Sequence, residues 1–210
     1  GVDGEFIDKQ SGEENSKKIN SGNLTWKRAQ DIFNGQKYTL FEGKLGISDE
    51  QQGTLENCYF ISATKALITY PNMICQMFKT KEINKENYFE VILFIDGKFQ
   101  IVIVDDYLPV YENNELVFSQ PKNNEIWLCI LEKAWAKVNG GYANILQGYI
   151  NEALEAFTGI PSVSLDHNAV RKEYLWRVLA EAKQKNTIIS SRTKLNVADV
   201  GLIKKHSYLF

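Results

Sequence analysis

The stretch that most restricts the fold is residues 88–110, YFEVILFIDGKFQIVIVDDYLPV. Two runs rich in β-branched and aromatic residues flank the pair Asp96-Gly97. An Asp-Gly pair readily adopts the positive φ angles of a type I′ turn, which joins neighbouring antiparallel strands. The stretch therefore predicts an antiparallel β-hairpin that Asp105-Asp106 and Pro109 bring to an end.

Helical patterns lie on both sides of this hairpin. Residues 58–70, CYFISATKALITY, have apolar side chains through successive turns with Pro71 just beyond, which predicts a buried helix. Residues 123–141 predict an amphipathic helix that Asn139-Gly140-Gly141 stops. Shorter segments predict helices within residues 150–161 and 172–186, and strands within residues 187–192 and 204–210.

The character of the chain changes near residue 160, from helix-rich to strand-bearing sequence. We expect an α+β protein with three parts: a polar N-terminal arm at residues 1–24, a helical subdomain at residues 25–160, and a strand-rich subdomain from residue 161 to residue 210.

Composition excludes several classes of protein. The 210 residues carry a net charge of −2, and the basic residues are scattered, which argues against a nucleic-acid partner. No apolar run approaches the ~20 residues of a membrane span, so we expect no transmembrane segment. The three cysteines are irregularly spaced and form no CxxC pair. This favours a reduced, cytoplasmic protein over a disulfide framework or a structural zinc site.

Nucleophilic catalysis is the chemistry that remains to be considered. Cys75 and Cys129 have large apolar neighbours in sequence, and we expect both to be buried and unreactive. Cys58 instead follows a polar turn and begins a predicted helix, whose positive end favours a thiolate. Gln52, six residues earlier, offers an amide donor near the sulfur. A structural role is the commoner one for such a cysteine, and both interpretations remain open on spacing alone.

The segments that carry the strongest resemblance occur in a fixed order. QGTLENCYF is similar to the active-site QGxLGDCW of calpains, which are papain-like cysteine proteases. Five other segments also resemble calpain segments in the same order, and together the six span residues 25–210: TWKRAQDI, VDDYLPV, NNEIWLCILEKAWAKVNGGYANILQG, EALEAFTG and GLIKKHSYLF.

The resemblance implies a papain-like fold in which the two subdomains form a cleft, with the second subdomain incomplete in this chain. It implies that Cys58 is the nucleophile and that His206 is the general base and acid. The side chain of Gln52 and the backbone amide of Cys58 would form the oxyanion hole. Gly148 and Tyr149 match the glycine pair that receives the substrate backbone. His167 has no counterpart, and we expect it at the surface.

The resemblance also implies bound calcium and protein substrates. The family ligands fall on the carboxylates of Asp49 and Glu125 and on carbonyls near Phe41 and Gly43, and oxygen ligands of this kind suit calcium. A calcium-dependent endopeptidase that acts within the cell on exposed protein segments is the leading hypothesis. Further domains of a larger chain are expected as partners.

The sequence departs from the family in four ways, of which three, at Glu56, Tyr59 and Tyr149, favour a second hypothesis, a non-catalytic calcium-binding or regulatory module. Glu56-Asn57 replaces Gly-Asp before the cysteine, and the Glu56 charge would oppose thiolate formation. Tyr59 replaces a tryptophan, and Tyr149 replaces the second glycine. The sequence ends at Phe210, before the family's asparagine that orients the histidine. We therefore expect a piece of a larger protein that is weakly active or inactive by itself.

Overall fold

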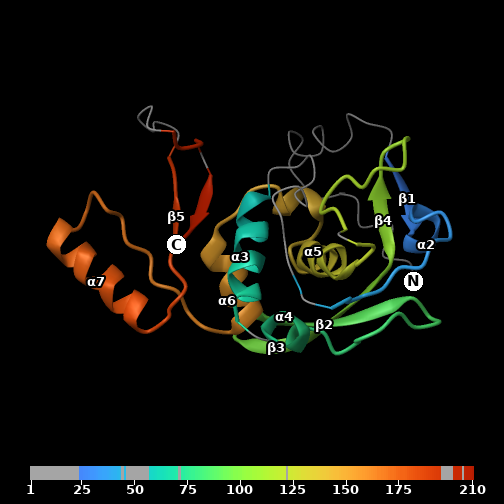
Figure 1. Cartoon of the computed structure of the whole chain (residues 1–210), viewed down its shortest axis with the longest axis horizontal. Helices are drawn as coiled ribbons and strands as arrows, with labels where there is room; N and C mark the ends of the chain where they lie inside the picture. The colour runs from blue at the N-terminus through green and yellow to red at the C-terminus, as the bar shows by residue number, and fades with distance from the viewer. Residues whose placement is uncertain are drawn as a thin grey trace.

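The computed structural model describes residues 24–43, 45, 57–70, 72–121, 123–194, 201–204 and 206–210. These residues form a mixed helix and strand structure, as expected for an α+β protein (Figure 1). The calcium ligand Asp49, the oxyanion donor Gln52 and the neighbouring Glu56 lie outside the described residues, as does the N-terminal arm up to residue 23.

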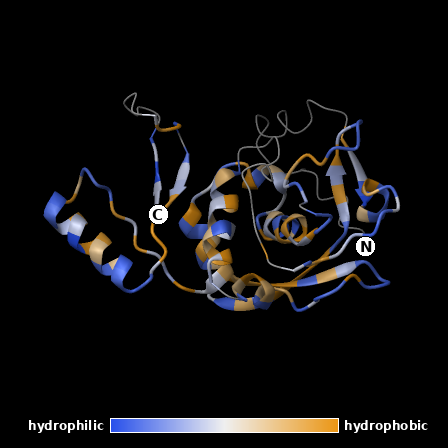
Figure 2. Ribbon diagram, viewed as in Figure 1, coloured by the Kyte–Doolittle hydropathy of each residue, from blue (hydrophilic) through white to orange (hydrophobic). Residues whose placement is uncertain are grey.

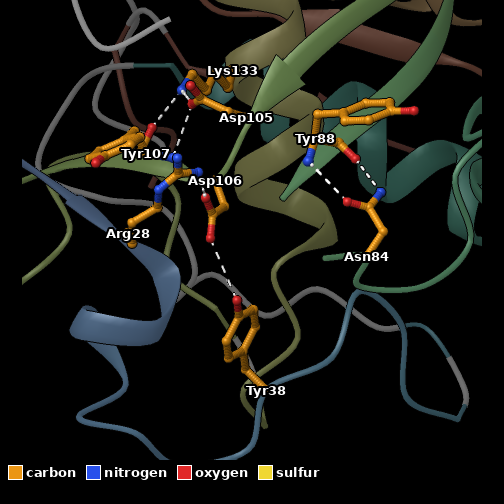
Figure 3. Close-up of polar contacts among 8 residues, drawn as sticks. All are labelled: Arg28, Tyr38, Asn84, Tyr88, Asp105, Asp106, Tyr107 and Lys133. Carbon is orange, nitrogen blue, oxygen red and sulfur yellow. Dashed lines mark hydrogen bonds and ion pairs between the residues drawn. The ribbon is translucent and has the colours of Figure 1, made fainter. Parts of the chain in front are cut away.

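The predicted hairpin is confirmed. Strands β2 (Tyr88–Ile95) and β3 (Lys98–Asp105) pair antiparallel, with Ile95 opposite Lys98 at the turn. Asp96 and Gly97 have φ angles of 51° and 76°, as a type I′ turn requires. At the start of β2, the Asn84 side chain hydrogen-bonds both backbone groups of Tyr88 (Figure 3).

The hairpin ends at Asp105-Asp106, as predicted, but Pro109 lies within a further strand. β3 ends at Asp105, and the chain becomes extended again as β4 (Tyr107–Val110). β4 pairs antiparallel with β1 (Thr25–Arg28), and Pro109 lies opposite Trp26. The Pro109 carbonyl accepts from the Val117 N–H and not from β1, so the missing proline N–H costs no hydrogen bond of the β1–β4 ladder.

The main core forms where helices α3 (Cys58–Ile68), α5 (Trp127–Val138) and α6 (Ile150–Thr158) meet the inner face of the hairpin. α5 is buried from Trp127 to Ala136 and ends at Asn139, followed by Gly140 with a φ of 82°. α6 ends at Gly159, whose φ of 69° is the left-handed C-cap expected for glycine. All three helices were predicted from the sequence.

The described residues contain four further helical segments. They are α2 (Ala29–Ile32), α4 (Met73–Met77), the 3₁₀ helix η3 (Tyr142–Ile145) and α7 (Lys172–Gln184). No residue of α7 is buried, although Figure 2 shows hydrophobic residues along it. No helix in the described ranges has the length and apolar character needed to cross a membrane.

Two short strands close the chain, as the sequence predicted. β5 (Ser190–Arg192) pairs antiparallel with β6 (Ser207–Leu209), and Arg192 lies opposite Ser207. Of the described residues after Thr158, only Ser207 is buried. The division into subdomains at residue 160 remains a prediction.

A network of charged side chains links β1, β4 and α5 (Figure 3). Arg28 donates to the buried carboxylate of Asp106 at 2.5 Å, and its guanidinium lies 4.1 Å from the centre of the Tyr107 ring. Lys133, on α5, is almost fully buried; it pairs with Asp105 and donates to the Tyr107 carbonyl at 2.6 Å. The adjacent residues Asp105 and Asp106 thus each bind one cation, and these ion pairs attach the β1–β4 sheet to the core.

Candidate active site

Cys58 is the first residue of α3, as predicted, and is partly exposed. The backbone amides of Cys58 and Tyr59 have no acceptor within the part of the chain that the structure describes. Free amides at a helix N-terminus, together with the positive end of the macrodipole, stabilise an anion placed there. Cys58 therefore stands at the positive end of α3, where an oxyanion would be stabilised.

The other two thiols differ from each other. Cys129 is fully buried in α5, and burial, followed by the nearby Glu132 charge, raises the pKa of its thiol far above the ordinary value. This confirms the prediction that Cys129 is buried. Cys75 is only partly buried, so the prediction of burial at that position is wrong. The five-residue helix α4 leaves one side of Cys75 uncovered, which apolar neighbours in sequence could not show.

His206 directly precedes β6, which packs against α3. The Ser62 hydroxyl donates to the Ser207 carbonyl at 3.4 Å. Ser62 follows Cys58 by four residues, so both side chains point from the same face of α3. The structure therefore brings the residue after His206 to the face of α3 that carries Cys58.

Backbone contacts hold His206 in place. Its N–H donates to the Thr193 hydroxyl at 2.9 Å, and the Thr193 N–H donates to the His206 carbonyl at 3.0 Å. The edge of the Tyr208 ring meets the imidazole, with ring centres 5.0 Å apart. His167, by contrast, is exposed at the surface, as expected.

Gly148 and Tyr59 fit each other closely. A Cβ atom at Gly148 would come within 2.6 Å of the Tyr59 ring, so only glycine is accommodated there. The Tyr59 hydroxyl donates to the Ile145 carbonyl and accepts from the Trp135 indole at 3.0 Å. Burial raises the pKa of Tyr59 to about 12, so the ring stays neutral and acts as packing beside Cys58.

Tyr149 extends into solvent next to Gly148, with 55% of its surface exposed. The Arg192 guanidinium lies 4.9 Å from the Tyr149 ring centre and donates to the Gly148 carbonyl at 3.3 Å. The sequence did not indicate this contact, because Arg192 is an ordinary surface cation in its strand. It connects the strand next to His206 with the loop that packs on Tyr59.

A buried carboxylate lies behind the start of α3. Glu132 accepts hydrogen bonds from the Asn57 side chain and from both the backbone N–H and the hydroxyl of Ser119. Burial raises the pKa of the Glu132 carboxyl to about 7, while the bonds from Ser119 and Asn57 act in the opposite direction. Glu132 was not predicted from the sequence, although an acidic side chain inside the apolar run WLCILEKAW was a usable signal.

Three of the four predicted calcium ligands lie on two adjacent segments. The Ile126 N–H donates to the Thr39 carbonyl and the Trp127 N–H donates to the Leu40 carbonyl, so residues 39–40 run beside residues 125–127. Glu125 is buried. Its carboxylate oxygens and the carbonyl oxygens of Phe41 and Gly43 are of the kind that binds calcium. Across the described ranges, no three His, Cys, Asp or Glu side chains gather as a metal cluster.

A partly exposed cysteine at a helix start, with a strand that directly follows a histidine and packs on that helix, is typical of cysteine proteases. The sequence matches the family model for "Calpain family cysteine protease" over residues 2–210. It is 31% identical to calpain-type cysteine protease DEK1 of Zea mays over 191 residues. It is also 30% identical to calpain-14 of Homo sapiens over 191 residues and 31% identical to calpain-A of Drosophila melanogaster over 194 residues.

The chain therefore belongs to the calpain family of cysteine proteases, which confirms the resemblance seen in the sequence. The alignments cover 86%, 88% and 88% of this chain but only 9%, 28% and 23% of the three relatives. The chain thus spans less than a third of the length of these proteins.

Proposed function

We propose that the chain carries the catalytic cysteine and histidine of a calcium-dependent endopeptidase that acts inside the cell on exposed, extended protein segments. The observation that carries this proposal is the position of Cys58 at an uncapped helix start, on the same face of α3 as the Ser62 contact to Ser207. The substrate would lie in a papain-like cleft, next to Gly148 and Tyr149.

In the proposed reaction the Cys58 thiolate attacks the carbonyl carbon of the peptide bond. The carbonyl oxygen becomes an oxyanion that the Cys58 backbone amide and the Gln52 side chain stabilise by hydrogen bonds. His206 takes the thiol proton and gives it to the leaving amine as the C–N bond breaks, which leaves a thioester on Cys58. Water, deprotonated by His206, then hydrolyses the thioester and restores the thiol.

A peptide electrophile that alkylates thiols tests the role of Cys58. Because Cys129 is buried, the informative comparison is between Cys58 and the partly exposed Cys75. We expect the electrophile to label Cys58 at least about tenfold faster than Cys75 in the native protein with calcium, since an activated thiolate reacts faster. Equal labelling of the two thiols would exclude Cys58 as an activated nucleophile.

Calcium would be held by Asp49 and Glu125 and by the carbonyls of Phe41 and Gly43, and it would draw the protein into its active arrangement. The support is the buried Glu125 side chain, whose segment pairs with Thr39 and Leu40, just before Phe41 and Gly43 in the chain. Isothermal titration should detect calcium binding, and Glu125→Gln should weaken it because a charged ligand is lost. Glu112→Gln, in the exposed turn after β4, is the matched control.

A second candidate function, a non-catalytic calpain-like module, is supported by the Arg192 contact. Arg192 donates to the Gly148 carbonyl, which a substrate backbone would need. Digestion of an unstructured protein by the full-length natural protein, with and without calcium, separates the candidates. Cleavage that disappears in Cys58→Ala supports the protease, and no cleavage at any calcium concentration supports the module.

A further inference from the structure

Asn57 occupies the N-cap position of α3 but does not cap the helix. Asparagine is among the best N-cap residues, because its side-chain oxygen usually accepts from the second or third amide of the helix. Here the side chain makes no such bond, and the backbone has φ −103° and ψ 35° instead of the extended conformation usual for a cap. Another group must therefore hold the Asn57 carboxamide.

Glu132 provides the alternative partner. The Asn57 Nδ2 atom donates to Glu132 Oε1, across 75 residues of sequence, and both residues are buried. Ser119 donates to the same carboxylate from its hydroxyl at 2.7 Å and from its backbone N–H at 2.9 Å. Three donors that converge on one buried carboxylate fix its position, so the Asn57 carboxamide is held against α5 and away from the helix end.

The position of the Asn57 side chain affects the surroundings of Cys58. A side-chain cap would place a carbonyl oxygen over the first turn of α3 and would offset part of the positive potential there. With the Asn57 side chain held by Glu132, the amides of Cys58 and Tyr59 keep no acceptor within the described ranges. The positive helix end is then free to stabilise the thiolate and the oxyanion.

We propose that Glu132 is a positioning residue, which holds the Asn57 side chain away from the first turn of α3 and so keeps the helix end open at Cys58. The inference rests on the proposed function for its meaning, but its test does not require proteolysis. The rate at which iodoacetamide alkylates Cys58 at fixed pH reports the fraction and reactivity of the thiolate, even in a chain that cleaves nothing.

The decisive experiment is a double-mutant cycle between Glu132→Met and Asn57→Ala in the full chain, with alkylation of Cys58 followed by mass spectrometry. Glu132→Met releases Asn57 to cap the helix, and we expect Cys58 to react about 2- to 5-fold more slowly, the range that corresponds to one charge–dipole interaction. In the Asn57→Ala background no side chain can cap, so Glu132→Met should not slow the reaction.

Two further variants control for folding and for loss of charge. Glu132→Gln should retain the wild-type rate, because its amide can donate to the Asn57 Oδ1 atom while its oxygen accepts from the Ser119 N–H. Ser119→Ala removes the hydroxyl donor to Glu132 but leaves Asn57 held, so its rate should also be retained. Circular dichroism confirms that each variant is folded.

The cycle can contradict the proposal in two ways. If Glu132→Met slows alkylation equally with and without the Asn57→Ala substitution, Glu132 acts only through general stability. If Glu132→Gln slows alkylation of Cys58 as much as Glu132→Met does, the negative charge of Glu132, and not its hydrogen bond to Asn57, determines the rate. Failure of the endopeptidase proposal would appear separately, as absence of cleavage with the alkylation pattern intact.

Discussion

The two partners of the proposed reaction lie in regions that are packed very differently. Cys58 begins a helix of the main core, whereas His206 belongs to the segment after Thr158, in which Ser207 is the only buried residue among those described. That segment contacts the rest through a few groups: Ser62 with Ser207, Arg192 with Gly148, and Tyr70 with the Asn186 carbonyl. Ile188 and Leu209 also pack on the core.

The two regions should therefore respond differently to mutation. Removing a buried partner in the core should lower the free energy of global unfolding, because the core unfolds cooperatively. Removing a contact of the histidine segment should instead release that segment locally, since few buried apolar contacts hold it. The following variants test this contrast.

The largest effect is expected for Lys133→Met in the charged network of Figure 3. The substitution leaves the Asp105 carboxylate, which is 12% exposed, without its buried cation. We expect urea unfolding to show a loss of about 3–5 kcal/mol. Lys79→Met, which removes the exposed partner of Glu90, is the control and should cost less than about 1 kcal/mol. Similar losses of unfolding free energy in both variants would contradict the expected difference between the buried and the exposed ion pair.

The next effect is a pH dependence due to Glu132. Burial raises the pKa of this carboxyl from 4.5 to about 7, so the folded chain holds a proton that the unfolded chain releases between these values. Stability is therefore lost as pH rises through this window, by roughly 3 kcal/mol at most. Glu132→Gln should flatten the profile of unfolding free energy between pH 4.5 and pH 7.

Asp166 serves as the comparison in the other region. It is fully exposed, and its pKa is lowered by the Asn168 N–H and by Lys194. Asp166→Asn should therefore leave the pH dependence of the unfolding free energy between pH 4.5 and pH 7 unchanged. If Asp166→Asn flattened the profile and Glu132→Gln did not, the assignment of the buried acid would be wrong.

A smaller and local effect is expected for Ser62→Ala. It removes the donor to the carbonyl of the buried Ser207, at a cost of about 1 kcal/mol, or roughly fivefold in a local opening equilibrium. Hydrogen exchange should become faster in β5 and β6 but not in α5. Thr64→Ala, which removes a bond to a carbonyl of its own helix, should leave exchange in β6 unchanged.

The smallest effect is expected for Arg192→Ala. The cation–π contact with Tyr149 and the bond to Gly148 are exposed, so their loss should accelerate exchange in β5 about 2- to 5-fold. Arg177→Ala breaks a similar contact with Tyr174 on α7 and should have no effect on β5. Faster exchange of β5 in both variants would mean that Arg192 has no specific role.

Local elements were predictable because their signals are local. The Asp96-Gly97 turn, the stop of α5 at Asn139 and the glycine end of α6 each depend on residues within a few positions. The pairing of β1 with β4 was not predictable, because it joins strands that are distant in sequence and includes Pro109 inside a strand. Proline usually indicates a strand end, and only an edge position overrides that rule.

The arrangement of the candidate site was not predictable from the sequence. The family segments pointed to Cys58, Gly148, Tyr149 and His206, whose roles remain predictions, and a close fit of Gly148 to the Tyr59 ring agrees with the glycine at that position. The Arg192 contact and the Glu132 network were missed, because each joins segments that are distant in sequence. Burial of Cys75 was wrongly predicted for the same reason.

Sequence alone was enough to predict the hairpin, the helices and membership of the calpain family, because turn residues, hydrophobic periodicity and ordered motifs are properties of neighbouring residues. Tertiary packing decided which thiol is buried, which carboxylate holds Asn57, and which strand brings Ser207, the residue after His206, to α3. These features depend on packing because burial and hydrogen-bond partners are set by how the elements meet. Packing joins residues such as Asn57 and Glu132 that local sequence cannot relate.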